Sequence, residues 1–105
     1  MKRPRTIEAG AREYKVIVDP LLQLNEGLVG MCDHQKCEIR LLPRYFSSQL
    51  DETLWHEIVH AINVVFLNDK LCEDVINPLG QGYSQVMKGI GITFEWEESA
   101  IIKGG

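Results

Sequence analysis

The residues best suited to chemistry are His56, Glu57 and His60, which lie within one five-residue stretch. On a helix, side chains four residues apart lie one above the other, so both imidazoles can reach the same metal ion. Zinc takes neutral imidazole nitrogens, and a carboxylate beside two such ligands can act as a general base toward water. The spacing therefore predicts two metal ligands and the general base of a zinc-dependent hydrolase.

This chemistry requires a helix, and the segment from Ser48 to Leu67 has the features of one. It contains no Gly or Pro, and Ser48 with Asp51 three residues later is typical of an N-cap pair. Its apolar residues recur at spacings of three and four and predict one continuous face toward a core: Leu50, Leu54, Ile58, Ala61, Ile62 and Val65. His56 and His60 lie on roughly the opposite side.

A hydrolytic zinc site needs a third protein ligand and one open position for water. We predict Glu73, at the start of a second helical pattern, as this ligand, with Asp74 as the alternative. Asn68 and Asp69 predict a turn that brings the two helices side by side, with Asp69 as the cap of the second helix. Asn77 lies one turn beyond Glu73 and is predicted to accept a hydrogen bond from a ligand imidazole.

The second helix has a predicted buried side and a predicted irregularity. The buried side is marked by apolar residues at helical spacing: Leu71, Val75, Leu79, Tyr83, Val86 and Met87. Pro78, Gly80 and Gly82 disfavour a regular helix, because Pro removes a backbone hydrogen bond and each Gly costs about 1 kcal/mol relative to Ala. Two interpretations are open. One is a close approach of this helix to the first, which keeps Glu73 near the metal, and the other is a loop between two short helices.

The motif and its surroundings resemble a known group of proteins. The matching residues are the stretch from Leu54 to Ile62, then Glu73, Val75, Leu79 and Gly82. They are similar to the minimal zincin-like metallopeptidase domains of phages and mobile elements, of the gluzincin type, which are related to the ImmA/IrrE and SprT-like peptidases. The chain lacks the cysteine-rich zinc ribbon that many SprT-like proteins add for DNA, so we do not expect a DNA role.

The resemblance implies a set of roles for particular residues. It implies zinc bound by His56, His60 and Glu73, with Glu57 as the residue that activates water. It also implies that the strand before the motif helix, residues 38–41, lies at the cleft and holds an extended peptide by backbone pairing.

The part of the chain before the motif helix has a strand-like pattern. Residues 6–9 and 13–18 predict one hairpin, and residues 28–32 and 37–42 predict a second. Strands followed by helices favour an α+β fold, in which a small, mostly antiparallel sheet packs against the motif helix and a second helix. Alternating apolar residues from Ile90 to Trp96 predict a last strand. We expect residues 1–105 to form a single zincin-like domain.

Length and charge narrow the classes of function. The chain has 105 residues, of which 45% are hydrophobic and 25% charged, which is typical of one small globular domain. The net charge is −4, and we predict Lys2, Arg3 and Arg5 to be a solvated tail, so no nucleic-acid partner is expected. No apolar run is long enough for a membrane span or a signal peptide, so we expect a cytoplasmic protein without membrane contact.

The three cysteines cannot all pair, which favours a reducing compartment over a disulfide scaffold. Cys72 is predicted to be buried packing. Cys32, His34 and Cys37 surround a predicted turn and are conceivable ligands of a second metal, although usual zinc sites have more closely spaced pairs of cysteines.

The predicted function is zinc-dependent hydrolysis of peptide bonds in a peptide or protein substrate, with Glu57 moving the proton. An oxyanion donor is also expected, and His34, Tyr45 and Tyr83 are the candidates by residue type. There are two alternatives. One is a non-catalytic, phage-encoded regulatory or interaction protein that binds metal and retains the zincin fold. The other is a metal-free helical interaction protein whose histidines line a groove. The residues favour no particular substrate sequence or oligomeric state.

Overall fold

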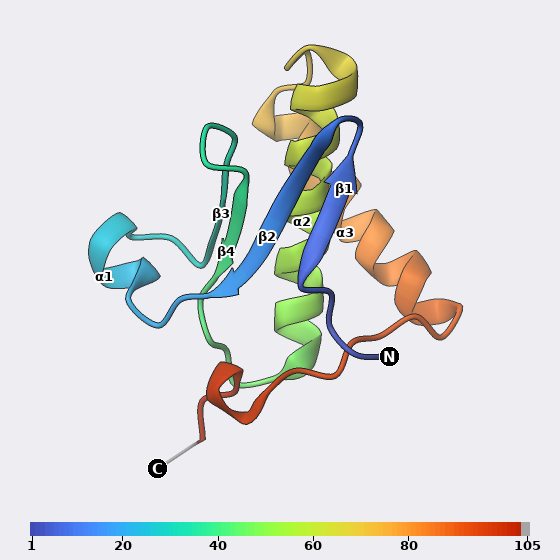
Figure 1. Cartoon of the computed structure of the whole chain (residues 1–105). Helices are drawn as coiled ribbons and strands as arrows, with labels where there is room; N and C mark the ends of the chain where they lie inside the picture. Colours follow the sequence, from blue (N-terminus) through green and yellow to red (C-terminus); the bar gives the residue numbers. More distant parts are fainter. Residues whose placement is uncertain (104–105) are drawn as a thin grey trace.

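A four-stranded sheet packed against a long helix forms the body of the protein (Figure 1), as seen in a computed structural model that describes residues 1–103. The strands are β1 (Thr6–Ala9), β2 (Arg12–Val18), β3 (Gly30–Asp33) and β4 (Glu38–Leu41). The helices are α1 (Leu22–Glu26), α2 (Ser47–Leu67) and α3 (Glu73–Gly89), followed by the 3-10 turn η1 (Glu98–Ala100). The predicted α+β fold is therefore confirmed, with α1 as an additional short helix.

The sheet has the order β1-β2-β4-β3. The two predicted hairpins are the antiparallel pairs β1/β2 and β3/β4, whereas β2 and β4 pair in parallel. The parallel pair arises because the chain passes through α1 to the far edge, forms β3 there and returns as β4. As a result β4 is paired on both sides, and β3 is the edge strand beside it. The expectation that residues 38–41 hold a peptide by backbone pairing is therefore wrong.

The hydrophobic core lies between the sheet and α2. Alternate positions of the strands and one face of the helix supply its largest buried side chains: Tyr14, Val16, Ile39, Leu41, Leu50 and Leu54. The predicted apolar face of α2 is thus confirmed at Leu50 and Leu54, while Ile62 at the margin of that face is exposed. Among residues 1–103, no helix combines the length and apolarity that a bilayer span requires.

The first turn of α2 is capped differently from the prediction. The N-cap is Phe46, whose backbone N–H donates a hydrogen bond to the side-chain oxygen of Gln49 at 3.1 Å. The predicted cap pair of Ser48 and Asp51 is wrong. Asp51 is instead a buried acceptor for the C-terminal segment.

This C-terminal segment is held by polar contacts and not by strand pairing. Asp51 accepts hydrogen bonds from the backbone N–H of Phe94 at 3.2 Å and from the indole N–H of Trp96 at 2.7 Å. Within residues 90–96, the structure has only an isolated bridge from Glu95 to the N-terminal segment. The predicted last strand is therefore wrong, because the alternation reflects an extended segment whose aromatic side chains pack inward.

The N-terminal segment is not a solvated tail. Arg3 is only 8% exposed, and its guanidinium forms a two-pronged ion pair with Glu97 at 3.0 and 2.8 Å. It also donates a hydrogen bond to the carbonyl oxygen of Val16 at 2.8 Å and lies over the Trp96 ring. Lys2 and Arg5 are exposed, but Lys2 forms a backbone bridge with Glu95 and the carbonyl of Arg5 accepts a hydrogen bond from the Val16 N–H, so the predicted tail is wrong for all three residues.

The N-cap of α3 lies three residues later than the predicted cap, Asp69. The residue before the first turn is Cys72, which is exposed, so neither Asp69 as the cap nor Cys72 as buried packing is correct. The helix runs without interruption through Pro78 to Gly89. The interpretation of two short helices joined by a loop is therefore excluded.

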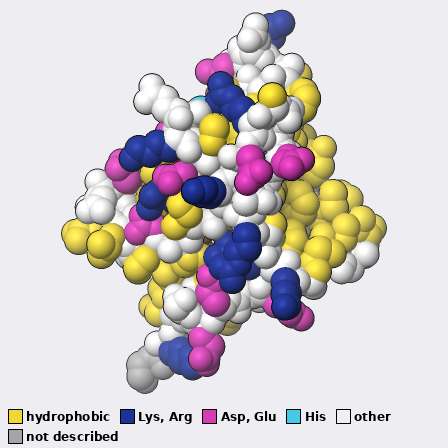
Figure 2. Space-filling model, in the orientation of Figure 1, with side chains coloured by type: hydrophobic (Ala, Val, Ile, Leu, Met, Phe, Trp, Pro, Cys, Tyr) yellow, Lys and Arg dark blue, Asp and Glu magenta, His cyan; other side chains and the backbone are white. Residues whose placement is uncertain are grey.

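The side of α3 that faces α2 also differs from the prediction. Ile76 and Gly80 are buried, whereas four members of the predicted stripe expose 40–60% of their surface: Val75, Leu79, Tyr83 and Val86. A Cβ atom placed on Gly80 would lie 3.0 Å from the Cα of His56, so α3 does approach α2 closely at this point. The exposed stripe is visible as a wide apolar area on the side of the molecule where α3 lies (Figure 2).

Candidate metal centre

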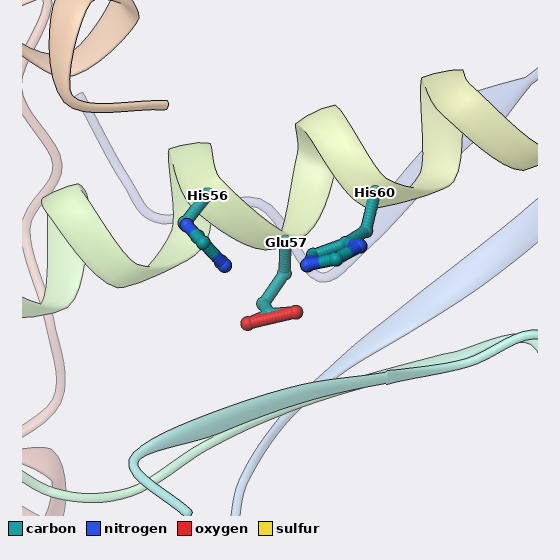
Figure 3. A group of neighbouring side chains, drawn as sticks. All are labelled: His56, Glu57 and His60. Carbon is teal, nitrogen blue, oxygen red and sulfur yellow. The ribbon is translucent and has the colours of Figure 1, made fainter. Parts of the chain in front are cut away.

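One side of α2 presents the three residues of the motif to the space between the helix and the sheet (Figure 3). Each of His56, Glu57 and His60 offers a ligand atom, and these atoms all lie within 4.8 Å of one another. The imidazole ring centroids are 4.9 Å apart. The helical spacing expected from the sequence thus brings both rings to one place.

Glu73, in the first turn of α3, contacts both imidazoles. Its Oε1 lies 3.2 Å from Nε2 of His56, and its Oε2 lies 3.3 Å from Nε2 of His60. Around a tetrahedral zinc ion with bonds of about 2.0–2.1 Å, neighbouring ligand atoms are separated by about 3.3–3.4 Å. Two imidazoles and one carboxylate are also a common zinc donor set. The residues present therefore fit zinc in both chemistry and spacing.

The other two predicted residues on α3 make no such contact. No ion pair or hydrogen bond joins Asp74 to either imidazole within the described part of the chain, whereas Glu73 reaches both. Asn77 lines the same cleft as Glu73. The hydrogen bond expected from a ligand imidazole to Asn77 is not formed among residues 1–103, so its supporting role stays a prediction.

The turn between α2 and α3 is held by Asn63, which is only 1% exposed. Its Nδ2 donates hydrogen bonds to Oδ1 of Asp69 at 3.1 Å and to the carbonyl of Leu71 at 3.2 Å. Its Oδ1 accepts a hydrogen bond from the Leu71 N–H at 3.0 Å. Asn68 and Asp69 reverse the chain with φ values of 56° and 58°. A buried, fully bonded amide therefore sets the direction in which α3 and Glu73 leave the turn.

The site opens into a cleft of about 690 Å³ between α2, β3 and the first turns of α3. β3 packs closely on α2 at Gly30, where an added Cβ would collide with the methyl group of Thr53 and lie 3.1 Å from Oε2 of Glu57. The absence of a side chain at Gly30 thus leaves the space beside Glu57 open.

The outer edge of β3 borders this cleft. The carbonyl of Val29 accepts a hydrogen bond from the Leu42 N–H at 2.9 Å, so the backbone groups of Val29 point toward the β4 side of the strand. In an antiparallel strand, the backbone groups of successive residues point alternately toward the partner strand and away from it. Gly30 and Cys32 therefore direct their N–H and C=O groups away from β4, toward the open edge. Both residues line the cleft.

Burial shapes the protonation of the site. Glu57 is 5% exposed, and its burial, reinforced by the charge of Glu73, raises its pKa to about 8. Burial also lowers the pKa of His60, although the charge of Glu73 opposes this shift. A lowered pKa favours the neutral imidazole that a metal ion requires.

The other possible metal ligands, Cys32, His34 and Cys37, do not converge on one point. His34 places its Nδ1 3.1 Å from the Tyr14 hydroxyl and 3.7 Å from Sγ of Cys32, while the thiol of Cys37 meets only the backbone carbonyl of His34. Within the described chain, no group of three metal donors forms around Cys32, His34 and Cys37. Burial, with a contribution from the Glu57 charge, raises the pKa of Cys32 to about 12, so its thiol stays protonated.

The predicted oxyanion donors are not at the cleft. None of His34, Tyr45 and Tyr83 is among the described lining residues, which include Arg44. Tyr83 instead stacks on Trp55, with ring centroids 6.3 Å apart. Arg44 lies only a few residues before α2, and its charge was the one available signal for a role at the cleft.

The sequence profile of the SprT-like family matches residues 10–100, from the start of β2 through both helices that carry the candidate ligands. The chain belongs to the SprT-like family. Membership in this zinc-associated, metallopeptidase-related family confirms the zincin-like resemblance at that level. The type found in phages and mobile elements stays a prediction. No curated protein and no solved structure matches this chain.

Proposed function

We propose that this SprT-like protein is a zinc-dependent peptidase that hydrolyses extended segments of peptide or protein chains. The observation that carries the proposal is the convergence of Glu73 on His56 and His60, with Glu57 buried beside them. Family membership supports a metallopeptidase-like domain. The proposed ligands are Nε2 of each histidine and the carboxylate of Glu73.

Zinc in such a site supplies a Lewis acid, which polarises the scissile carbonyl and lowers the pKa of water. Glu57 is the proposed general base. It accepts a proton from the attacking water as the water oxygen bonds to the carbonyl carbon, and it donates a proton to the amine nitrogen as the C–N bond breaks. Its buried position keeps solvent from competing for this proton, and a bound cation would favour its carboxylate form.

The proposed substrate lies along the outer edge of β3. Among residues 1–103, no backbone hydrogen bond engages the outward-facing groups of Gly30 and Cys32, so an extended peptide can add to the sheet there as a further strand. Such a peptide would pass directly over the catalytic base, because the space at Gly30 adjoins Oε2 of Glu57. The cleft volume is within the range of typical ligand sites.

The decisive experiment replaces Glu57 by Gln, which keeps the shape of the side chain and removes the base. We expect one zinc ion per chain to remain bound, while turnover of an unfolded protein substrate falls by about 100-fold or more. Glu13→Gln, which changes an exposed glutamate on β2 that does not line the cleft, is the matched control and should retain activity.

Equal turnover in Glu57→Gln and the parent would remove Glu57 from the mechanism. A parent that binds zinc but cleaves no peptide in a diverse mixture would instead support the non-catalytic metal-binding protein. Absence of zinc from protein purified without a histidine tag would favour the metal-free interaction protein.

We also propose a reducing, cytoplasmic location. The three cysteines, Cys32, Cys37 and Cys72, are all free thiols in the structure. Free thiols persist in reducing compartments, whereas secreted domains of this size are usually cross-linked. Thiol titration of protein isolated from its host should find three reactive groups after denaturation.

A further inference from the structure

The outer side of α3 carries a stripe of exposed apolar residues, which we call the α3 stripe: Val75, Leu79, Tyr83, Val86 and Ile90. Their exposed fractions are 45%, 40%, 41%, 60% and 66%, in that order. At 3.6 residues per turn, they fall within an arc of roughly 100° on the helix surface. The pattern is that of a buried helix face, yet within residues 1–103 the structure buries Ile76 and Gly80 instead.

The exposed area is large for so small a protein. On the neighbouring helix α2, Ile62 and Phe66 are also 37% and 62% exposed, and Figure 2 shows a wide apolar area on this side of the molecule. With full side-chain areas of about 150–200 Å², the α3 stripe and these two residues together expose roughly 600 Å². A stable interface buries about 800 Å² per partner, so this surface could supply most of one.

The α3 stripe is arranged so that it complements itself. Its centre falls between Gly82 and Tyr83, with Val75 and Ile90 equally distant from that point. Leu79 and Val86 are also equally distant from it. In an antiparallel pair of α3 helices related by a two-fold axis, Leu79 would face Val86 of the partner subunit. An added Cβ at Gly82 would have nothing within 4 Å, so the helix backbone is accessible where the two helices would cross.

The direction of α3 also suits a second copy of the chain. Antiparallel packing of two α3 helices opposes their two helix dipoles, which is favourable. Glu73 is directed to the imidazoles of α2, so the proposed contact between the two copies is apolar.

The geometry points to a two-fold dimer in which the α3 stripe packs antiparallel on the α3 stripe of a second copy. Asn77 and Gln81, which line the cleft, lie on the other side of α3. Both clefts would therefore stay open to substrate.

The test measures mass in solution by sedimentation and light scattering up to about 200 µM. We expect a dimer of about 24 kDa, twice the 12.0 kDa of one chain. Leu79→Glu and Val86→Lys should each yield monomers with parental circular dichroism, because each puts an unpaired charge in the interface. Leu24→Glu changes an apolar residue that is 82% exposed on α1, and it should leave the dimer intact.

Mixing the two variants tests the register directly. In the antiparallel pair, the new glutamate at position 79 of one subunit faces the new lysine at position 86 of the other, so the mixture should form a heterodimer. A parent that is monomeric at all concentrations would overturn the proposal and leave the stripe for a different protein partner. A dimer that survives both substitutions, or a mixture that stays monomeric, would also overturn it.

Discussion

Glu73 is the one proposed ligand that does not come from α2. Two imidazoles four residues apart offer only two ligand atoms, which is too few for a stable zinc site. The carboxylate of Glu73 completes the set at 3.2 and 3.3 Å from the two Nε2 atoms. Metal binding therefore depends on how α3 is placed against α2.

Replacing Glu73 by Ala should weaken zinc binding by about 100-fold or more, because it removes both a ligand and its negative charge. Competition with a chelating dye at neutral pH measures the affinity. Asp74→Ala makes the same change in charge one residue later and should alter the affinity by less than about threefold. The opposite ranking of the two variants would make Asp74 the ligand.

At the level of residues, spacing within one helix and the approach of Glu73 to the two histidines were predictable, whereas most other side-chain contacts between elements were not. His56 and His60 converge because a helix turn fixes their separation, whatever the rest of the fold does. The imidazole contact expected of Asn77 depends on the rotation of α3. The position of Arg44 at the cleft depends on the loop before α2, which no local pattern specifies.

At the level of elements, the α2–α3 turn determines where α3 begins and therefore where Glu73 lies. Asn63→Ala leaves the half-buried N–H and C=O of Leu71 without their partner, so we expect a loss of about 1–3 kcal/mol in the free energy of unfolding. Zinc affinity should fall by about tenfold as well, because the first turn of α3 is no longer held in place. Asn63→Asp, which keeps the acceptor for the Leu71 N–H, should show a smaller loss of both.

A control separates positioning from general destabilisation. Val16→Ala removes buried volume from β2 and touches none of the hydrogen bonds of the turn, so it should lower the unfolding free energy without changing zinc affinity. If both variants bind zinc as the parent does under conditions where they are folded, Asn63 has only a structural role. Asn63 could have been noticed in the sequence as a polar residue within an otherwise apolar part of α2.

The existence of the elements was predictable, but their covered faces were not. α2 begins at Ser47 and ends at Leu67, close to the predicted bounds, because its apolar repeat and the lack of Gly and Pro act locally. The side of α3 that packs on α2 is chosen instead by Gly80, since a missing side chain allows the closer contact. An apolar stripe shows that a face is covered by something, without showing by what.

At the level of the whole molecule, an ion pair joins the two ends of the described chain. Arg3 and Glu97 are separated by 94 residues, so no sequence pattern indicated their contact. Only 6% of the Arg3 side chain and 29% of the Glu97 side chain are exposed. The pair therefore fastens the N-terminal segment to the C-terminal segment beside the core, where Trp96 also packs.

The hydrogen bonds from the Arg3 guanidinium hold the pKa of Glu97 below its ordinary value of 4.5. A carboxylate with a lowered folded-state pKa contributes stability above its unfolded pKa, and this contribution is lost as the pH falls through the folded pKa. Glu97→Gln should therefore lower the unfolding free energy by about 1–3 kcal/mol at pH 7, and the difference from the parent should shrink toward about pH 3.

Urea unfolding of the metal-free protein at several pH values measures this difference without a contribution from zinc release. Glu98→Gln is the matched control, because the Glu98 side chain is 89% exposed and its ion pair in the described chain is with the exposed Lys103. Its effect should be near zero at every pH. If Glu97→Gln destabilised the protein equally at neutral and acidic pH, the effect would come from packing, and the ion pair would not be what fastens the two ends together.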